Sequence, residues 1–325
     1  MLSRTLSPLK TMIECFVGFD TSNYTTSVAV CEKNGKIIAN LKSPLAVSEG
    51  ERGLRQSDAV FAQVKNLPEL CDELSEILSG LTPVAVGCSS KPRDIEGSYM
   101  PCFLSGIAAA HSFAAGRGLS VYNFSHQAGH VKAALYSSGA KIDGDFIAFH
   151  VSGGTTEILY VKQEKNSGLS IKKIGGTKDL NAGQSIDRIG VAMGLRFPCG
   201  REMDELALSN AMPVKDIHIS VDGLECNLSG LENLSLKLYE KAGDRALTSA
   251  FAFEFLYRTF AKLTENIREI YPDIPIVYAG GVMSSRYISS RLKGNNAYFA
   301  LPEFSSDNAA GIALLARDKY LRENK

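Results

Sequence analysis

Two histidines stand four residues apart, at the ends of the segment His126-Gln127-Ala128-Gly129-His130. On an α-helix this spacing places both imidazoles on one face and one turn apart, which suits a shared metal ion. The same spacing also fits a polar helix face or two satisfied core histidines. Gln127 stands where a zinc protease carries a glutamate base, and an amide cannot take up a proton, so the sequence argues against metalloprotease chemistry.

A carboxylate far along the chain could complete this set. Asp307 lies at the expected start of the last helix, where an aspartate is often only an N-terminal cap. If the fold brings Asp307 to the histidines, the result is two imidazoles and one carboxylate with open positions. We then expect one divalent metal ion, with iron(II) favoured and zinc as the alternative.

A strand-turn-strand motif occurs twice in the chain. The segment Phe19 to Val28 resembles the segment Phe149 to Ile158, and each has an apolar run, a turn of small residues and a second apolar run. The backbone N–H groups of such turns can hold an anion. The repeat predicts two similar lobes that handle a nucleotide or a phosphate.

Three glycine-containing turns, at 152–155, 199–200 and 280–281, could let backbone amides approach a nucleotide. Asp187 lies on the helix expected from about 182 to 193. Its carboxylate could hydrogen-bond a ribose hydroxyl, or it could pair with the adjacent Arg188 at the surface.

The composition limits the class of protein. With 325 residues, of which 45% are hydrophobic, the chain can form two ordinary domains, and strands alternate with helices as in α/β proteins. The net charge is zero, with 35 basic and 35 acidic residues, so a nucleic-acid substrate would need a local basic patch or a partner.

The seven cysteines are irregularly spaced, and neither a secretory signal nor an apolar stretch of about 18 residues is present. We therefore expect a cytoplasmic protein that does not contact a membrane. Residues 1–11, ahead of the first strand, are interpreted as a disordered extension or a misassigned start.

These motifs, in this order, resemble the tRNA threonylcarbamoyladenosine transferase (TsaD) family, formerly called O-sialoglycoprotein endopeptidases. The resemblance covers about residues 13 to 318. The matching segments are Phe19 to Ser22, His126 to His130, Val151 to Thr156, Ala182 to Asp187, Gly194 to Gly200, Ser229 to Leu231, Ala279 to Val282 and Ser306 to Ala310.

The resemblance implies a two-lobed actin-like ATPase (ASKHA) fold with duplicated RNase H-like lobes. We expect a first lobe at 12–121, on which a C-terminal helix at 306–325 packs back, and a second lobe at 122–305 that holds the metal and nucleotide site.

The resemblance also implies an enzyme that moves a threonylcarbamoyl group from threonylcarbamoyl-adenylate to N6 of the adenosine beside the tRNA anticodon. The expected partners are threonylcarbamoyl-adenylate or another adenine nucleotide, tRNA, a second actin-like subunit and an ATPase. His126, His130 and Asp307 match the family's metal ligands. The positions matched to its substrate contacts are Val151, Ser152, Gly153, Gly154, Thr155, Asp187, Gly200 and Ser285.

Several positions depart from the family pattern: 23–25, the 91–97 loop, Thr155, Glu232 and Ser285. These departures leave an alternative open, in which the chain is a non-catalytic paralogue that binds a nucleotide and a partner subunit as a scaffold. Metal content separates the two hypotheses, because a scaffold has no need of a bound metal ion.

Overall fold

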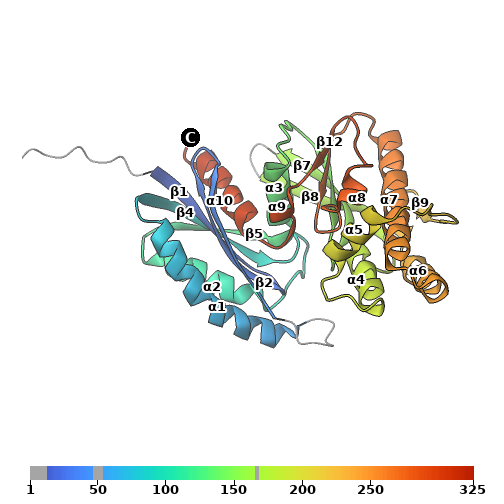
Figure 1. Cartoon of the computed structure of the whole chain (residues 1–325). Coiled ribbons are helices and arrows are strands. Elements are labelled where there is room, and N and C mark those ends of the chain that lie inside the picture. The colour runs from blue at the N-terminus through green and yellow to red at the C-terminus, as the bar shows by residue number, and fades with distance from the viewer. Residues whose placement is uncertain (1–12, 47–53, 165–167) are drawn as a thin grey trace, which may run out of the picture. The chain divides into compact units, whose positions relative to one another are not determined.

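The computed structural model describes residues 13–46, 54–164 and 168–325. The expected N-terminal extension at 1–11 therefore lies outside the described residues. The chain divides into two compact units, Met1–Gly129 with Asp307–Lys325 and His130–Ser306, which Figure 1 shows in the colours of the chain. Across the described ranges, every helix is too short or too polar to cross a membrane.

The first unit is built on a five-stranded sheet in the order β3-β2-β1-β4-β5. β1 pairs antiparallel with β2 and parallel with β4, and its side chains are almost all buried, as expected for a strand covered on both faces. The strands are β1 (Ile13–Thr21), β2 (Thr25–Glu32), β3 (Ile37–Pro44), β4 (Leu81–Lys91) and β5 (Ser120–Ser125).

Helices cover both faces of this sheet (Figure 1). α1 (Gln56–Ile77) and α2 (Phe103–Ala115) pack on one face through a core that includes Val17 and Phe19. α10 (Ala310–Glu323), the last helix, lies on the other face, where a Cβ on Gly18 would stand 2.5 Å from the amide nitrogen of Ala313. The C-terminal helix thus belongs to the first unit.

The second unit has a seven-stranded sheet in the order β12-β11-β6-β7-β8-β10-β9. Its strands are β6 (Phe146–Val151), β7 (Thr156–Glu164), β8 (Gly168–Thr177), β9 (Ser220–Asp222), β10 (Glu225–Asn227), β11 (Ile276–Ala279) and β12 (Ala297–Phe299). Its helices are α4 (Ala182–Ala192), α5 (Gly200–Ser209), α6 (Ser229–Ala242), α7 (Arg245–Ile270), α8 (Arg286–Ser289) and α9 (Pro302–Ser305).

Side chains of β6 alternate between two cores. Ile147 and Phe149 enter the larger core with helices α4 to α8, whereas Phe146 and Ala148 pack under α3 (His126–Ser137). α3 is one continuous helix whose first turn falls in the first unit and whose remainder falls in the second. The first unit extends past the expected boundary at residue 121, because β5 joins its sheet.

The repeated strand-turn-strand motif is present in both units. Thr21 pairs with Thr26 across the first turn, and Val151 pairs with Thr156 at the equivalent position of the second. The amide of Ser22 donates to the Thr25 carbonyl at 3.1 Å, and that of Ser152 to the Thr155 carbonyl at 2.7 Å. The two turns are therefore closed by the same bond, and the predicted repeat is confirmed.

Candidate functional site

The start of α3 is held by neighbouring polar groups. The Ala128 amide donates to Ser125 Oγ at 3.2 Å, so Ser125 caps the helix. Ser125 Oγ in turn donates to Asp94 Oδ2 at 2.8 Å, and the Gln127 amide donates to the Pro92 carbonyl at 3.0 Å. The divergent 91–97 loop thus anchors the helix turn that carries His126.

The structure brings Asp307 to the two histidines. His126, His130 and Asp307 each offer one ligand atom, and these atoms all lie within 4.8 Å of one another. The two histidines are one turn apart on α3, as their spacing predicts. Asp307 lies in the segment that connects α9 to α10, and the residue at the cap position of α10 is Ala309, so Asp307 is not that cap.

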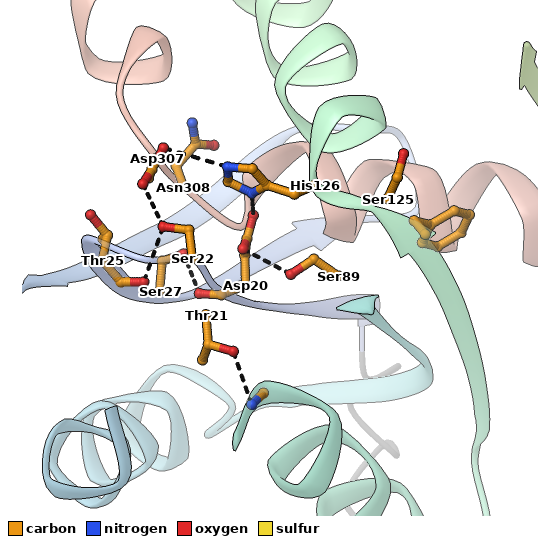
Figure 2. A network of polar contacts seen from close by, with 12 residues as sticks. Asp20, Thr21, Ser22, Thr25, Ser27, Ser89, Ser125, His126, Asp307 and Asn308 are labelled. Atoms are coloured by element: carbon orange, nitrogen blue, oxygen red, sulfur yellow. Dashed lines mark hydrogen bonds and ion pairs between the residues drawn. The ribbon is translucent and has the colours of Figure 1, made fainter. Parts of the chain in front are cut away.

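A second carboxylate lies behind His126, at the end of β1. Figure 2 shows the His126 ring between two carboxylates: Nδ1 is 2.7 Å from Asp20 Oδ2, and Nε2 is 3.6 Å from Asp307 Oδ1. Ser89 Oγ donates to the other oxygen of Asp20 at 2.8 Å, and Ser22 Oγ donates to Asp307. A carboxylate that orients a metal-ligating histidine is a recurrent arrangement in metal sites.

These carboxylates determine the charge of the site. Burial alone would lower the pKa of His126, but the charges and hydrogen bonds of Asp20 and Asp307 outweigh it and raise the pKa to about 10. The ring therefore carries a proton in the metal-free chain, and the site favours a positive charge. Two imidazoles and a carboxylate, backed by Asp20, are a donor set that fits a divalent metal ion.

Sequence reasoning did not identify Asp20 or Ser89 as parts of this site. Asp20 lies within the repeated motif, two residues before the turn at 22–25, and this position is the only signal for it in the sequence. Ser89, on β4, becomes its partner only once β1 and β4 are paired in the sheet.

The second unit offers an open turn at the end of β6. A Cβ added to Gly153 or Gly154 would meet no atom within 4 Å. The start of α4 packs directly on this turn, since a Cβ on Gly183 would stand 2.7 Å from the Gly153 nitrogen, and the Ala182 amide donates to Thr156 Oγ1 at 2.9 Å. A small-residue turn beside a helix N-terminus suits an anionic group.

The double-glycine turn after β11 lies beside the same strand end. Gly280 has a φ of +97°, and a Cβ there would stand 2.2 Å from the Val151 carbonyl oxygen. The Val282 amide donates to that carbonyl at 3.2 Å. Gly281 and Gly200 both have open space where a side chain would begin.

Asp187 and its neighbour have separate partners. Asp187 Oδ1 accepts from the Cys199 amide at 2.8 Å, which joins α4 to the start of α5, and burial raises the pKa of this carboxyl. Arg188 instead pairs with Glu232 on α6 at 3.1 Å. The divergent Glu232 therefore has a cationic partner next to the candidate nucleotide contacts.

Ser285 has a structural role in this fold. Its hydroxyl accepts from the Ile288 amide at 3.2 Å and donates to Asp204, so it caps α8 while only 6% exposed. Val151 likewise is buried, and Thr155 closes its own turn through its carbonyl. The turns at 152–155 and 280–281 both contact the end of β6, and α4 packs on the first of them. Ser285 instead stabilises the start of α8.

The sequence is similar to those of known proteins. The sequence model of the family described as TsaD, tRNA N6-adenosine threonylcarbamoyltransferase, matches residues 97–314. A protein of Streptococcus suis (strain 05ZYH33) named tRNA N6-adenosine threonylcarbamoyltransferase is 30% identical, over 95% of this chain and 93% of its own length.

Two solved structures share the fold. Component A of the (R)-2-hydroxyglutaryl-CoA dehydratase of Acidaminococcus fermentans has a TM-score of 0.54 at 13% identity, over 94% of this chain and 99% of the other. A ROK family glucokinase of Streptomyces griseus has a TM-score of 0.50 at 13% identity, over 93% and 99% of the two chains. The expected two-lobed actin-like α/β fold is confirmed.

Proposed function

Since this chain belongs to the TsaD family of tRNA N6-adenosine threonylcarbamoyltransferases, we propose that it moves a threonylcarbamoyl group from threonylcarbamoyl-adenylate to N6 of the adenosine beside a tRNA anticodon. The family accounts for the general activity, which is group transfer in tRNA modification. The observation that carries the metal-dependent form of the proposal is the convergence of His126, His130 and Asp307.

In this proposal the three side chains hold one divalent ion, with iron(II) favoured and zinc as the alternative. When bound, the ion would supply Lewis-acid polarisation of the carbamoyl and carboxylate oxygens of the substrate. Asp20 keeps the His126 ring in the orientation that turns Nε2 toward Asp307. Ser22 donates a hydrogen bond to Asp307 and so restricts that carboxylate.

The adenylate would bind in the second unit. The open turn at Gly153 and Gly154, beside the N-terminus of α4, would accept the phosphate through backbone N–H groups. Asp187 has one oxygen bonded to the Cys199 amide, and its other oxygen is assigned to a ribose hydroxyl. The open space at Gly200 and Gly281 allows the nucleoside to approach the backbone.

The transfer forms a C–N bond between N6 of the tRNA adenosine and the carbamoyl carbon. It breaks the bond from that carbon to the phosphate oxygen, and AMP and one proton leave. The acceptor tRNA and two protein partners, a second actin-like subunit and an ATPase, belong to the proposal as implications of the family resemblance.

One observation favours the alternative of a non-catalytic scaffold. In the first unit, the turn equivalent to 152–155 contains Asn23, whose side chain accepts a hydrogen bond from Gln56, and Tyr24, which is 46% exposed. This turn therefore carries two larger side chains where the turn of the second unit has two glycines. A scaffold would bind a nucleotide in the second unit without transferring the group.

The direct test is transfer of radiolabelled threonylcarbamoyl from the adenylate to a tRNA transcript, with the partner proteins supplied. The proposal expects label in the tRNA with the wild-type chain and a loss of at least about 100-fold with Asp307→Ala, because removing a metal ligand removes the polarising ion. Asp143→Ala, at an exposed aspartate of the second unit, is the matched control and should retain activity. Adenylate binding without any labelled tRNA would favour the scaffold.

A further inference from the structure

Two buried polar side chains interrupt an apolar face of the second unit's sheet. Along β6, Phe146 and Ala148 point into the small core under α3, and His150 follows them at the next position of that face. His150 is 7% exposed and Glu157, on β7, is 4% exposed. Burying an imidazole and a carboxylate is costly unless polar contacts compensate, so their placement calls for a physical reason.

His150 and Glu157 lie directly opposite one another in the register of β6 and β7. Opposite residues of an antiparallel pair have their side chains on the same face, with Cβ atoms about 5 Å apart. Lys173 Nζ lies 3.5 Å from Glu157 Oε1 and provides a half-exposed positive partner for the carboxylate. The strand register therefore places an imidazole and a carboxylate side by side in an otherwise apolar layer.

The ring of His150 packs against the ring of His130. Their centroids are 4.6 Å apart and their planes are inclined by 39°. His130 is one of the three residues that offer a ligand atom to the candidate metal ion. Among the residues that the structure describes, His150 is not a member of that group, so it lies behind a ligand and outside the ligand set.

The repeated motif gives His150 a counterpart in the first unit. Asp20 is the penultimate residue of β1, before the turn at 22–25, and His150 is the penultimate residue of β6, before the turn at 152–155. Asp20 contacts His126, and His150 contacts His130. Equivalent strand ends thus each place one buried polar residue against one histidine of α3.

We propose that His150, oriented by Glu157, is a positioning residue that fixes the ring of His130 for metal binding. The proposal rests on the proposed metal site and adds a specific support for its second imidazole. Groups behind metal ligands commonly set ligand orientation, and their loss lowers metal affinity by about 10- to 100-fold.

The test measures the affinity of the full chain for Co²⁺ by competition with a chromophoric chelator, together with the visible absorption spectrum of the bound ion. His150→Ala and the isosteric Glu157→Gln should each lower the affinity by about 10- to 100-fold and change the spectrum. Because Glu157 acts through His150, adding Glu157→Gln to His150→Ala should change the affinity by no more than about 2-fold.

Phe149→Leu is the matched control, since Phe149 is a buried neighbour that faces the opposite core. It should lower the melting temperature and leave the Co²⁺ affinity within about 2-fold of the wild type. If His150→Ala does not fold, Glu157→Gln still decides the question, because it preserves shape and removes only the charge.

Unchanged Co²⁺ affinity and spectrum in both single variants would overturn the inference while leaving the metal site in place. Loss of one imidazole from the bound ion in His150→Ala, measured by X-ray absorption, would make His150 a ligand and also overturn it. A wild-type chain that binds no Co²⁺ would overturn both this inference and the proposed metal site.

Discussion

At the scale of single residues, the contact between Asp20 and His126 determines the orientation of the imidazole ring, whose Nε2 faces Asp307. With a metal ion bound, the imidazole would be neutral: Nδ1–H would donate to Asp20 Oδ2, which lies at 2.7 Å, and the Nε2 lone pair would serve as the ligand. Asp20 is itself fixed, because Ser89 Oγ donates to one of its oxygens and Ser27 Oγ donates to its carbonyl. The orientation of His126 is thus imposed by buried groups of the sheet.

Asp20→Asn should lower the affinity for a divalent metal by about 10- to 100-fold, because an amide that donates to Nδ1 stabilises the wrong tautomer. The measurement is metal competition with a chelator on the purified chain. Glu14→Gln is the control: this carboxylate lies on the same strand but pairs at the surface with Lys33. Equal affinity of Asp20→Asn and wild type would show that Asp20 does not orient the ligand.

Spacing alone indicates ligands only where local geometry relates them, and Asp307 enters the predicted set through the resemblance to the family. His126 and His130 could be proposed together because helix periodicity places them on one face. Asp20 could not, because 106 positions separate it from His126 and only the pairing of strands brings it there. Ser285 is predicted as a substrate contact from its matched position alone, and in the structure its hydroxyl caps α8 and contacts Asp204.

At the scale of elements, the turn between β6 and β7 is open, although elements pack closely around it. Gly153 and Gly154 have free space at their Cβ positions, while Gly183 of α4 touches the backbone of the turn. Packing therefore requires a glycine at position 183 but not at positions 153 and 154. We infer that Gly153 and Gly154 are small because a ligand approaches the backbone there.

Gly154→Val should leave the melting temperature nearly unchanged and lower the affinity for an adenine nucleotide by at least about 10-fold, because the added side chain fills space reserved for the ligand. Calorimetric titration of the purified chain with the nucleotide measures this effect. Gly183→Ala is the contrasting control and should cost about 1–3 kcal/mol of stability, since its Cβ would contact backbone at 2.7 Å. Unaltered nucleotide binding by Gly154→Val would contradict the assignment.

The repeated strand-turn-strand elements could be predicted from sequence because apolar runs and small-residue turns are local patterns. The long-range contacts around these elements could not be predicted from such local patterns. Gln56 of α1 donates a hydrogen bond to Asn23 in the first turn, and Asp94 of the 91–97 loop accepts one from Ser125 at the start of α3. Both contacts join segments that only the folded unit brings together.

At the scale of the whole molecule, the chain ends by returning to the unit in which it began. Residues Asp307–Lys325 belong to the first unit, and α10 covers one face of its sheet. The glycines Gly18 and Gly87 allow this close approach, since added Cβ atoms would stand 2.5 Å and 2.9 Å from the backbone of α10. The same return delivers Asp307 to the site.

Gly18→Val should destabilise the first unit by about 1–3 kcal/mol or more, because its side chain would displace α10 from the sheet. Hydrogen exchange measured by mass spectrometry should show faster exchange in β1 and β4 than in the wild type. Peptides from β6 and β11 in the second unit are the internal control and should exchange at wild-type rates. Equal acceleration in both units would contradict this assignment of α10.

The family and the fold class could be predicted from the order of the motifs, because that order resembles the TsaD family over most of the chain. The extent of the units could not. The expected boundary at 121–122 falls inside β5, whereas the two units divide within α3, after Gly129. A helix shared by two units gives no local signal in its sequence.

The most direct measurement is the metal content of the purified wild-type chain beside His126→Ala and Asp307→Ala, with His218→Ala as a control at an exposed histidine. The account predicts about one divalent ion per chain in the wild type and in His218→Ala, and loss of that ion in the other two variants. A wild-type chain without metal, or variants that retain it, would contradict the central claim that these side chains form a metal site.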